Sequence, residues 1–202
     1  MRNLFSAHPV AELGTLDDKE LMVKIQQDSD HHAFEVIYMR YRKDVMSYVS
    51  YLIFDKNKVE EITHDVFIKA FRFKNKYDHS FKFKTWLYTL ARNTSIDIMR
   101  KNQDLRFDDL FGDAERDISD VEDPQEGPED QVINKSESEL VMQAMEKIPA
   151  DQREVLSLMA LSELSYKEIH EITGKSVANI KVLVHRGKKA LAEQLKKMGE
   201  EV

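Results

Sequence analysis

The chain has 202 residues, 42% of them hydrophobic, and a formal net charge of −7. That length and composition suit one large or two small folded domains. There is no cysteine, which excludes disulfides and thiolate metal sites. No apolar run approaches the ~18 residues of a membrane span. The N-terminus also lacks an apolar signal core, so we expect a cytoplasmic protein with no membrane insertion.

The first half of the chain carries apolar residues at steps of three and four, which predicts helices. One stripe runs from Phe34 to Leu52, another from Val59 to Phe73, and a further helix is expected from about Lys84 to Lys101. Thr15, with Asp18 three residues on, is expected to cap a helix that opens there. No alternating strand pattern appears, so the sequence predicts an all-α protein.

Aromatic residues alternate with basic ones between residues 78 and 102. This composition suits single-stranded nucleic acid, because rings stack on unpaired bases while cations follow the phosphate backbone. The alternative is that the rings belong to the core, and for Phe83 and Trp86 we favour that alternative. A core role does not exclude binding, since core and groove can share one helix.

Residues 103–134 hold twelve acidic residues against Arg106 and Arg116, together with two of the four prolines. They contain few large apolar side chains and cannot offset their ordering entropy, which predicts an acidic disordered linker. The other 170 residues carry a net charge of +3, so the acidity belongs to this segment. We therefore expect two small helical domains, residues 1–102 and 135–202. The linker is either a plain tether or an acidic strand that occupies a basic channel of a partner.

The C-terminal part begins with an apolar stripe that ends before Pro149. Asp151 and Glu154 then resemble a capping box that opens the next helix. In the stretch "SYKEIHEITGKSVANIKVLVHRGKKAL", residues 165–191, a second capping box pairs Ser165 with Glu168. Gly174 supplies the positive φ that ends this helix, and Ser176 caps the following one.

The last helix has one packing side and one basic side, as a helix-turn-helix requires for entry into the major groove. The packing side is Val177, Ile180, Val184, Gly187, Leu191 and Leu195. The opposite side is Ala178, Lys181, Val182, His185, Arg186 and Lys189.

Four segments together resemble a bacterial extracytoplasmic-function (ECF) sigma factor of the sigma-70 superfamily. They are "AFEVIYMRYRKDVMSYV", "VEEITHDVFIKAF", "FKFKTWLYTLARNTSIDIMRK" and "IPADQREVLSLMALSELSYKEIHEITGKSVANIKVLVHRGKKAL". The resemblance covers residues 16–195 apart from the linker. It implies a protein that binds core RNA polymerase and promoter DNA, and that is under anti-sigma control. The first domain would melt and read the −10 element, and the second would read the −35 element. Such proteins are not enzymes and use no cofactor, metal or small-molecule substrate.

The resemblance also assigns individual residues. The segment "VEEITHDVF" matches the family's polymerase-binding helix, with His64 where Gln is usual. A carboxylate cluster beside an exposed apolar edge suits docking on a basic partner helix. The expected polymerase-binding residues are Glu60, Glu61, His64, Asp65, Phe67 and Ile68.

The −10 element is expected to contact a loop and the helix that follows it, with residues 77–81 holding the captured base. The residues involved are Tyr77, His79, Phe81, Lys82, Lys84, Trp86, Arg92, Asn93, Asp97 and Arg100. The −35 element is expected to contact Ser176, Ala178, Asn179, Lys181, Val182, His185, Arg186 and Lys189. Here the chain departs from the family, because Ala178-Asn179-Ile180 replaces the common G-T-V and Val182-Leu183 replaces S-R. His170 also replaces a small residue.

Two other classes of function fit parts of the sequence. Asp28 with His31, and Glu61 with His64, have the carboxylate-x-x-His spacing of helical di-iron proteins. Such a site needs two further inward carboxylates, and the helical periodicity places Glu61 and His64 beside the apolar stripe rather than within it. A stand-alone helix-turn-helix regulator would explain residues 135–202, but not the polymerase-binding segment or the aromatic and basic helix.

The linker generates a prediction. A relaxed chain of 32 residues spans about 30 Å, whereas two promoter elements two helical turns apart are separated by about 70 Å. Repulsion among the acidic residues favours the extended linker. Replacing the acidic residues of 103–134 by Ser and Gly, at constant length, should therefore weaken run-off transcription more than it weakens core binding. Wild-type transcription at every salt concentration would instead identify a plain tether.

Overall fold

The computed structural model describes residues 13–101, 135–162 and 164–200 of the chain. Every regular element within these residues is helical, which confirms the predicted all-α fold. The chain divides into two compact units, Met1–Ile98 and Met99–Val202, and each is described by itself. The predicted linker, residues 103–134, lies outside the described residues, so the division into three parts stays a prediction.

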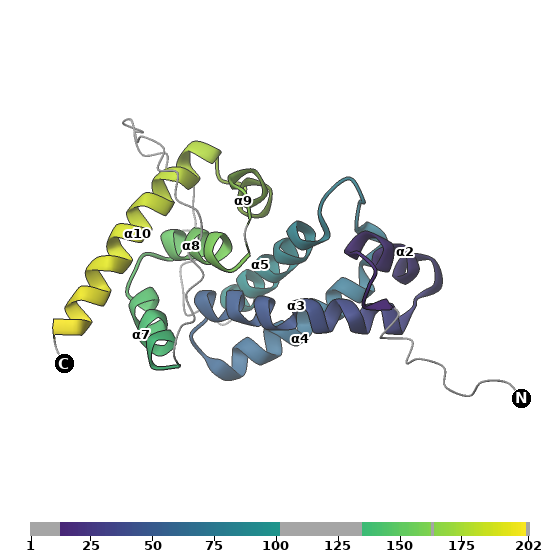
Figure 1. The fold of residues 1–202 in the computed structure, drawn as a ribbon, viewed down its shortest axis with the longest axis horizontal. Helices are drawn as coiled ribbons and strands as arrows, with labels where there is room; N and C mark the ends of the chain where they lie inside the picture. The colour runs from purple at the N-terminus through teal and green to yellow at the C-terminus, as the bar shows by residue number, and fades with distance from the viewer. Residues whose placement is uncertain (1–12, 102–134, 163, 201–202) are drawn as a thin grey trace, which may run out of the picture. The chain divides into compact units, whose positions relative to one another are not determined.

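The N-terminal unit is a set of packed helices in which α3 packs along α4 and α2 packs on α3 (Figure 1). Its elements are α2 (Asp18–Asp28), α3 (His31–Leu52), α4 (Lys56–Arg72), the 3₁₀ turn η1 (Lys74–Lys76) and α5 (Phe83–Lys101). The predicted apolar stripes form the core. The buried residues include Ile37, Val45, Tyr48, Ile62, Val66 and Ala70.

The start of α2 differs from the prediction. Asp17, not Thr15, is the N-cap, and its carboxylate accepts the N–H of Glu20 at 2.8 Å. The carboxylate of Glu20 in turn accepts the N–H of Asp17 at 2.9 Å, which completes a capping box. Asp18 instead contacts α3, where it accepts hydrogen bonds from Arg40 and from the hydroxyl of Tyr41. These contacts join the start of α2 to α3.

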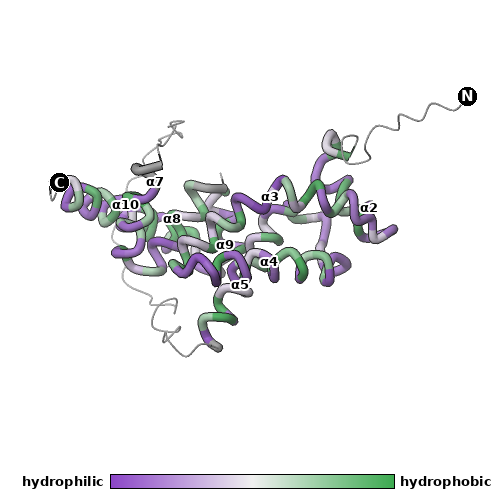
Figure 2. Tube along the Cα trace, turned by 90° about the horizontal axis from the view of Figure 1, so that it is seen from below, coloured by the Kyte–Doolittle hydropathy of each residue, from purple (hydrophilic) through white to green (hydrophobic). Residues whose placement is uncertain are grey.

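The C-terminal unit is built around one long helix that contacts each of the other three (Figure 1). Its elements are α7 (Lys135–Glu146), α8 (Ala150–Ser162), α9 (Tyr166–Thr173) and α10 (Val177–Glu200). Hydrophobic and hydrophilic residues alternate along α10 (Figure 2), as expected for a helix with one buried face. The buried residues include Ala144, Met145, Val155, Leu158, Ile169 and Ile180.

The capping box expected at Asp151 and Glu154 is wrong. Helix α8 already begins at Ala150, and Glu154 is buried rather than folded back over the first turn. Arg153 instead ends the preceding helix. Its Nη1 donates to the carbonyls of Met145, Glu146 and Ile148 at 3.4, 3.4 and 3.2 Å. Carbonyls at a helix C-terminus have no partner within the helix, so a basic side chain can satisfy them.

Gly187 lies at the contact between α10 and α8. A Cβ at this position would be 2.8 Å from Cδ1 and 3.0 Å from Cγ of Leu156, which is buried. The absence of a side chain therefore allows the two helices to approach. The sequence predicted that Gly187 belongs to the packing side of this helix, and its contact with α8 confirms it.

Within residues 13–101, 135–162 and 164–200, no helix has both the length and the apolar character that crossing a membrane requires.

Gly187 generates a stability prediction. Gly187→Leu should lower the free energy of unfolding by about 1–3 kcal/mol, because a side chain in a packed seam forces its neighbours apart. Gly199→Leu is the matched control on the same helix, since nothing lies within 4 Å of that position. Urea unfolding followed by far-UV circular dichroism measures both variants. Equal stability of the two variants would show that the seam can absorb the extra volume.

Candidate nucleic-acid and polymerase interfaces

The helix-turn-helix is formed by α9, a short turn and α10, and its local signals are those expected from the sequence. Ser165 Oγ accepts the N–H of Glu168 at 3.3 Å, and the carboxylate of Glu168 accepts the N–H of Ser165 at 2.8 Å. Gly174 has a φ of 76°, which glycine adopts without strain. Ser176 Oγ accepts the N–H of Asn179 at 3.2 Å, so it caps α10.

One contact in this turn was not predicted. Nδ1 of His170 lies 2.8 Å from the carbonyl oxygen of Lys175, and because a carbonyl only accepts, His170 donates. The bond closes the turn across five residues. The histidine that departs from the family pattern therefore has a structural role in orienting α10, and no local periodicity could have indicated it.

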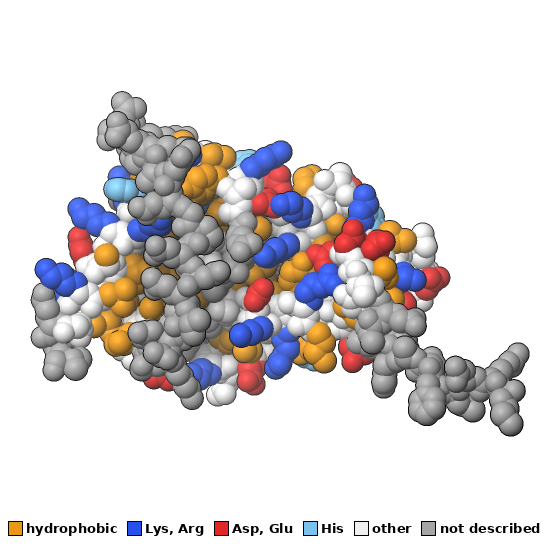
Figure 3. Space-filling model, in the orientation of Figure 1, with side chains coloured by type: hydrophobic (Ala, Val, Ile, Leu, Met, Phe, Trp, Pro, Cys, Tyr) orange, Lys and Arg blue, Asp and Glu red, His pale blue; other side chains and the backbone are white. Residues whose placement is uncertain are grey.

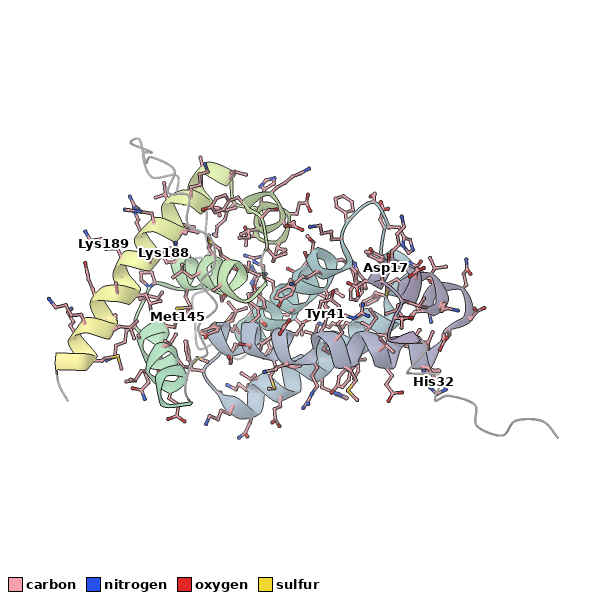
Figure 4. The ribbon with its side chains drawn as sticks, in the orientation of Figure 1. Asp17, His32, Tyr41, Met145, Lys188 and Lys189 are labelled. Atoms are coloured by element: carbon pink, nitrogen blue, oxygen red, sulfur yellow. The ribbon has the colours of Figure 1, made fainter. Side chains whose placement is uncertain are left out.

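The residues predicted to contact the −35 element lie on the outer side of α10. Five are exposed, namely Ser176, Ala178, His185, Arg186 and Lys189, while Asn179, Lys181 and Val182 are half-buried. Lysine and arginine side chains line the outer edge of α10 in Figure 3, and Lys189 extends away from α7 in Figure 4. The neighbouring Lys188 is also exposed and was not predicted. The exposed basic side chains on this side of α10 are therefore His185, Arg186, Lys188 and Lys189.

Lys181 and Val177 refine this picture. The Nζ of Lys181 lies 5.8 Å from the centre of the Tyr166 ring, a cation–π contact that orients the ammonium group. Val177 was expected on the packing side but is 39% exposed. The buried seam begins one turn later, at Ile180 and Leu183, because Val177 is the first residue of the helix.

The predicted −10 loop follows η1 and precedes α5. Tyr77 is only 5% exposed, so it supports the loop instead of facing a captured base. Its ring contacts those of His79, Phe83 and Trp86, with centroids 4.9, 5.6 and 5.5 Å apart. Its hydroxyl donates to the carbonyl of Phe81 at 2.8 Å. The ring of Phe81 is 53% exposed and is the aromatic surface that the loop offers.

The remaining −10 residues fall into two groups. Lys82, Asn93, Asp97 and Arg100 are exposed, and His79, Lys84, Trp86 and Arg92 are half-buried. Phe83 is buried in the core, as we favoured. The loop also carries Asp78, whose carboxylate accepts the N–H of Ser80 at 2.9 Å. This bond lowers the pKa of Asp78, so the loop keeps one negative charge among its basic side chains.

The predicted polymerase-binding surface lies along α4. Glu60, Glu61 and His64 are exposed and Asp65 is half-buried. Phe67, however, is only 3% exposed, and its ring packs against those of Phe34 and Tyr38, at 6.4 and 4.9 Å. Phe67 therefore does not belong to an exposed apolar edge, because its side of α4 faces α3, and its contact with polymerase stays a prediction.

The exposed apolar side chains of α3 and α4 are Met39 and Ile68, not Phe67. Ile68 of α4 is 50% exposed, and Met39 of α3 is 67% exposed. Ile68 was predicted, whereas Met39 lies outside the apolar stripe of α3 and gave no periodic signal. These two residues, and not Phe67, supply the apolar surface of this part of the unit.

The residues of the di-iron alternative do not converge. Asp28, His31, Glu61 and His64 are all exposed, and the ring of His31 stacks on that of Phe71 at 5.0 Å. Across residues 13–101, 135–162 and 164–200, no three His, Cys, Asp or Glu side chains are grouped so that they could hold a metal ion.

Two family models match the chain. The model described as sigma-70 region 2 matches residues 37–104, and that described as sigma-70, region 4 matches residues 138–191. Among curated relatives, the ECF RNA polymerase sigma factor SigW of Bacillus subtilis is 32% identical over 188 residues, 88% of this chain and 98% of its own. SigM of the same organism is 34% identical over 157 residues, 77% of this chain and 90% of its own.

Solved structures show the same fold. CnrH, in complex with the cytosolic domain of CnrY, matches with a TM-score of 0.65 and 18% identity, over 89% of this chain and 97% of that one. The sigma factor RpoE, in complex with the anti-sigma factor NepR from Bartonella quintana, matches with a TM-score of 0.61 and 24% identity, over 81% and 96%.

The two matched regions contain the aromatic and basic helix and the helix-turn-helix, in the order that the sequence predicted. The match to region 2 also excludes a protein that is only a helix-turn-helix regulator. The chain therefore belongs to the extracytoplasmic-function sigma factors, which bind core RNA polymerase and direct promoter-specific transcription initiation.

Proposed function

We propose that the two units of this sigma factor divide promoter recognition between them. The N-terminal unit binds core polymerase through α4 and reads the −10 element with the loop before α5 and with α5 itself. The C-terminal unit reads the −35 element with α10. The observation that carries this proposal is the division of α10 into a buried seam at Ile180, Leu183 and Val184 and an exposed basic face.

For the −35 element, α10 enters the major groove with its first turns against the bases. Val182 is small and apolar, which suits contact with a thymine methyl group. Lys181 and Arg186 contact bases or phosphates, and Lys189 adds a phosphate contact further along the helix. The cation–π contact with Tyr166 holds Lys181 ready for this role.

For the −10 element, the exposed ring of Phe81 is a stacking surface for an unpaired base. Lys82 and Arg100 are exposed basic side chains that would contact the phosphate backbone. Stacking contributes about 1–3 kcal/mol per base, which is comparable with the few kcal/mol needed to extrude a base from the duplex. The loop therefore helps to hold the melted strand open.

For core polymerase, the acidic side chains Glu60, Glu61 and Asp65 dock against a basic surface, and Ile68 adds apolar contact. The protein acts in the cytoplasm as an initiation factor, without enzymatic activity. An anti-sigma factor is its regulatory partner, by analogy with the complex in which a sigma factor of the same fold binds NepR. Run-off transcription with purified core polymerase, followed by start-site mapping, tests the whole scheme.

Arg186→Ala tests the −35 assignment. Transcription should fall about tenfold or more at promoters that depend on the upstream element, because a good base contact contributes roughly 1–3 kcal/mol. Lys197→Ala is the matched control, since it removes one exposed charge from the same helix beyond Lys189, the last residue predicted to contact DNA. An equal loss at promoters that lack the upstream element would contradict the assignment.

Asp65→Lys tests the polymerase-binding assignment. Competition for core polymerase should weaken at least tenfold, because the reversed charge opposes a basic partner. The helical circular dichroism signal should stay the same, since Asp65 is only half-buried and a charge near the surface contributes little to stability. Glu139→Lys, at an exposed acid of α7, is the control and should compete normally. A folded Asp65→Lys variant with unchanged affinity would remove α4 from the interface.

A further inference from the structure

Helix α2 is bonded to the segment that leads into the −10 loop, although it lies before the region-2 match at residues 37–104. The contact is made by Gln26, near the C-terminal end of the helix. Its Nε2 donates to the carbonyl of Lys74 at 2.9 Å and to that of Tyr77 at 3.1 Å. Its Oε1 lies 2.6 Å from Nε2 of His79. One half-buried amide therefore binds three residues of a segment about fifty positions away.

The partners fix the chemistry of the contact. Two carbonyl oxygens can only accept, so the amide nitrogen of Gln26 must face them and its oxygen must face His79. His79 must then carry a proton on Nε2 and donate it. Its Nδ1 is buried and has no hydrogen-bond partner among the described residues. The single bond to Gln26 consequently sets both the tautomer and the orientation of the imidazole ring.

His79 in turn contacts Tyr77, which is bonded to the backbone of Phe81. Its ring packs on that of Tyr77, with centroids 4.9 Å apart, and the hydroxyl of Tyr77 donates to the carbonyl of Phe81. A continuous series of contacts thus runs from Gln26 to the backbone of the residue with the exposed ring. Within the loop, the N–H of Phe81 donates to the carbonyl of Asp78 at 3.1 Å and the N–H of Ser80 donates to its carboxylate at 2.9 Å. The contacts with Gln26, His79 and Tyr77 join this local turn to the rest of the unit.

A second pair of residues reinforces the junction. The Nζ of Lys74 donates to Ser29 Oγ at 2.7 Å and lies 4.3 Å from the centre of the Phe71 ring. Ser29 ends α2 in the left-handed conformation, with a φ of 53°. The end of α2 therefore holds η1 by both a side-chain amide and a hydroxyl.

Helix α2 is itself firmly held. Asp18 at its start accepts bonds from Arg40 and Tyr41 of α3, and Leu21, Met22 and Ile25 are buried. Since Gln26 is half-buried and directly follows Ile25, its position is set by the packing of α2 on α3. The amide is thus a fixed anchor for the loop.

We propose that Gln26 is a positioning residue for −10 recognition, which holds the loop of residues 77–82 in the shape that receives an unpaired base. This role rests on the proposed function of the loop. Ordering a loop before binding removes an entropic cost that binding would otherwise bear. Gln26 does not touch DNA; it acts through His79, Tyr77 and the backbone of Phe81.

The test uses the full-length protein with core polymerase. Gln26→Ala removes all three bonds. Gln26→Glu keeps the side-chain volume but replaces the donor by an acceptor that faces two carbonyl oxygens. Gln27→Ala is the matched control, because Gln27 is the same residue type one position along α2 and is exposed. Run-off transcription is measured on a set of promoters with each base at the captured position, together with competition for core polymerase. Hydrogen exchange of the amides of residues 77–82 reports the loop directly.

Both Gln26 variants should lower transcription at the preferred −10 sequence roughly tenfold, since they lose two or three hydrogen bonds. They should also reduce the difference in transcription between promoters that carry different bases at the captured position. Amide hydrogen exchange in the loop should become faster. Core competition should not change, and Gln27→Ala should match wild type in every measurement. A template that is already melted across the −10 element should not restore the lost base preference, because the loop itself is misplaced.

Wild-type transcription and base preference in both Gln26 variants would overturn the proposal. So would a loss of core binding as large as the loss of transcription, which would indicate a general structural role. The Phe81→Ala variant distinguishes a failure of the positioning role of Gln26 from a failure of the proposed −10 recognition by the loop. If Phe81→Ala leaves the base preference unchanged, the loop does not read the −10 element and both ideas fail. If Phe81→Ala abolishes the preference while the Gln26 variants retain it, only the positioning role is lost.

Discussion

The structure depends on the burial of one face of every helix, because short helices are not stable alone in water. Helix α9 has 8 residues, fewer than the ~12–15 at which an isolated helix becomes even marginally stable. It exists because Ile169 and Ile172 are buried and because Ser165 and Gly174 close its two ends. The same rule governs α10. Its recognition face is available to DNA only because the opposite face is committed to α7, α8 and α9.

This constraint explains why the sequence predicted the helices so well. Burial on one face leaves a period of three to four residues, and the stripes of α3 and α4 are buried as expected. Local capping signals also transfer directly, as at Ser165 and Glu168. They failed at Thr15, because Asp17 competes for the same role and stands directly before the first helical residue. Aspartate is also a better N-cap than threonine, so the nearer and stronger acceptor caps α2.

The site residues were predicted less completely, for a different physical reason. A motif gives the position of Phe67 or Tyr77 but not the side of the structure that each ring faces, and both rings are buried. Exposed apolar residues such as Met39 leave no periodic signal. The bonds of Gln26 to residues 74, 77 and 79, and that of His170 to Lys175, join side chains to distant or irregular backbone. Only the folded structure shows such pairs.

The length of α10 gives its packing a mechanical consequence. A helix of 24 residues is about 36 Å long. The part of α10 after Lys189 carries no predicted DNA contact, yet it belongs to the same helix as the recognition face. A tilt of about 5° at one end would move the other end by about 3 Å, close to the ~3.4 Å rise between base pairs. The contact with α7 therefore helps to set the tilt of α10, and with it the position of the recognition face. Substitutions at the contact between α7 and α10 can therefore change which base step α10 meets.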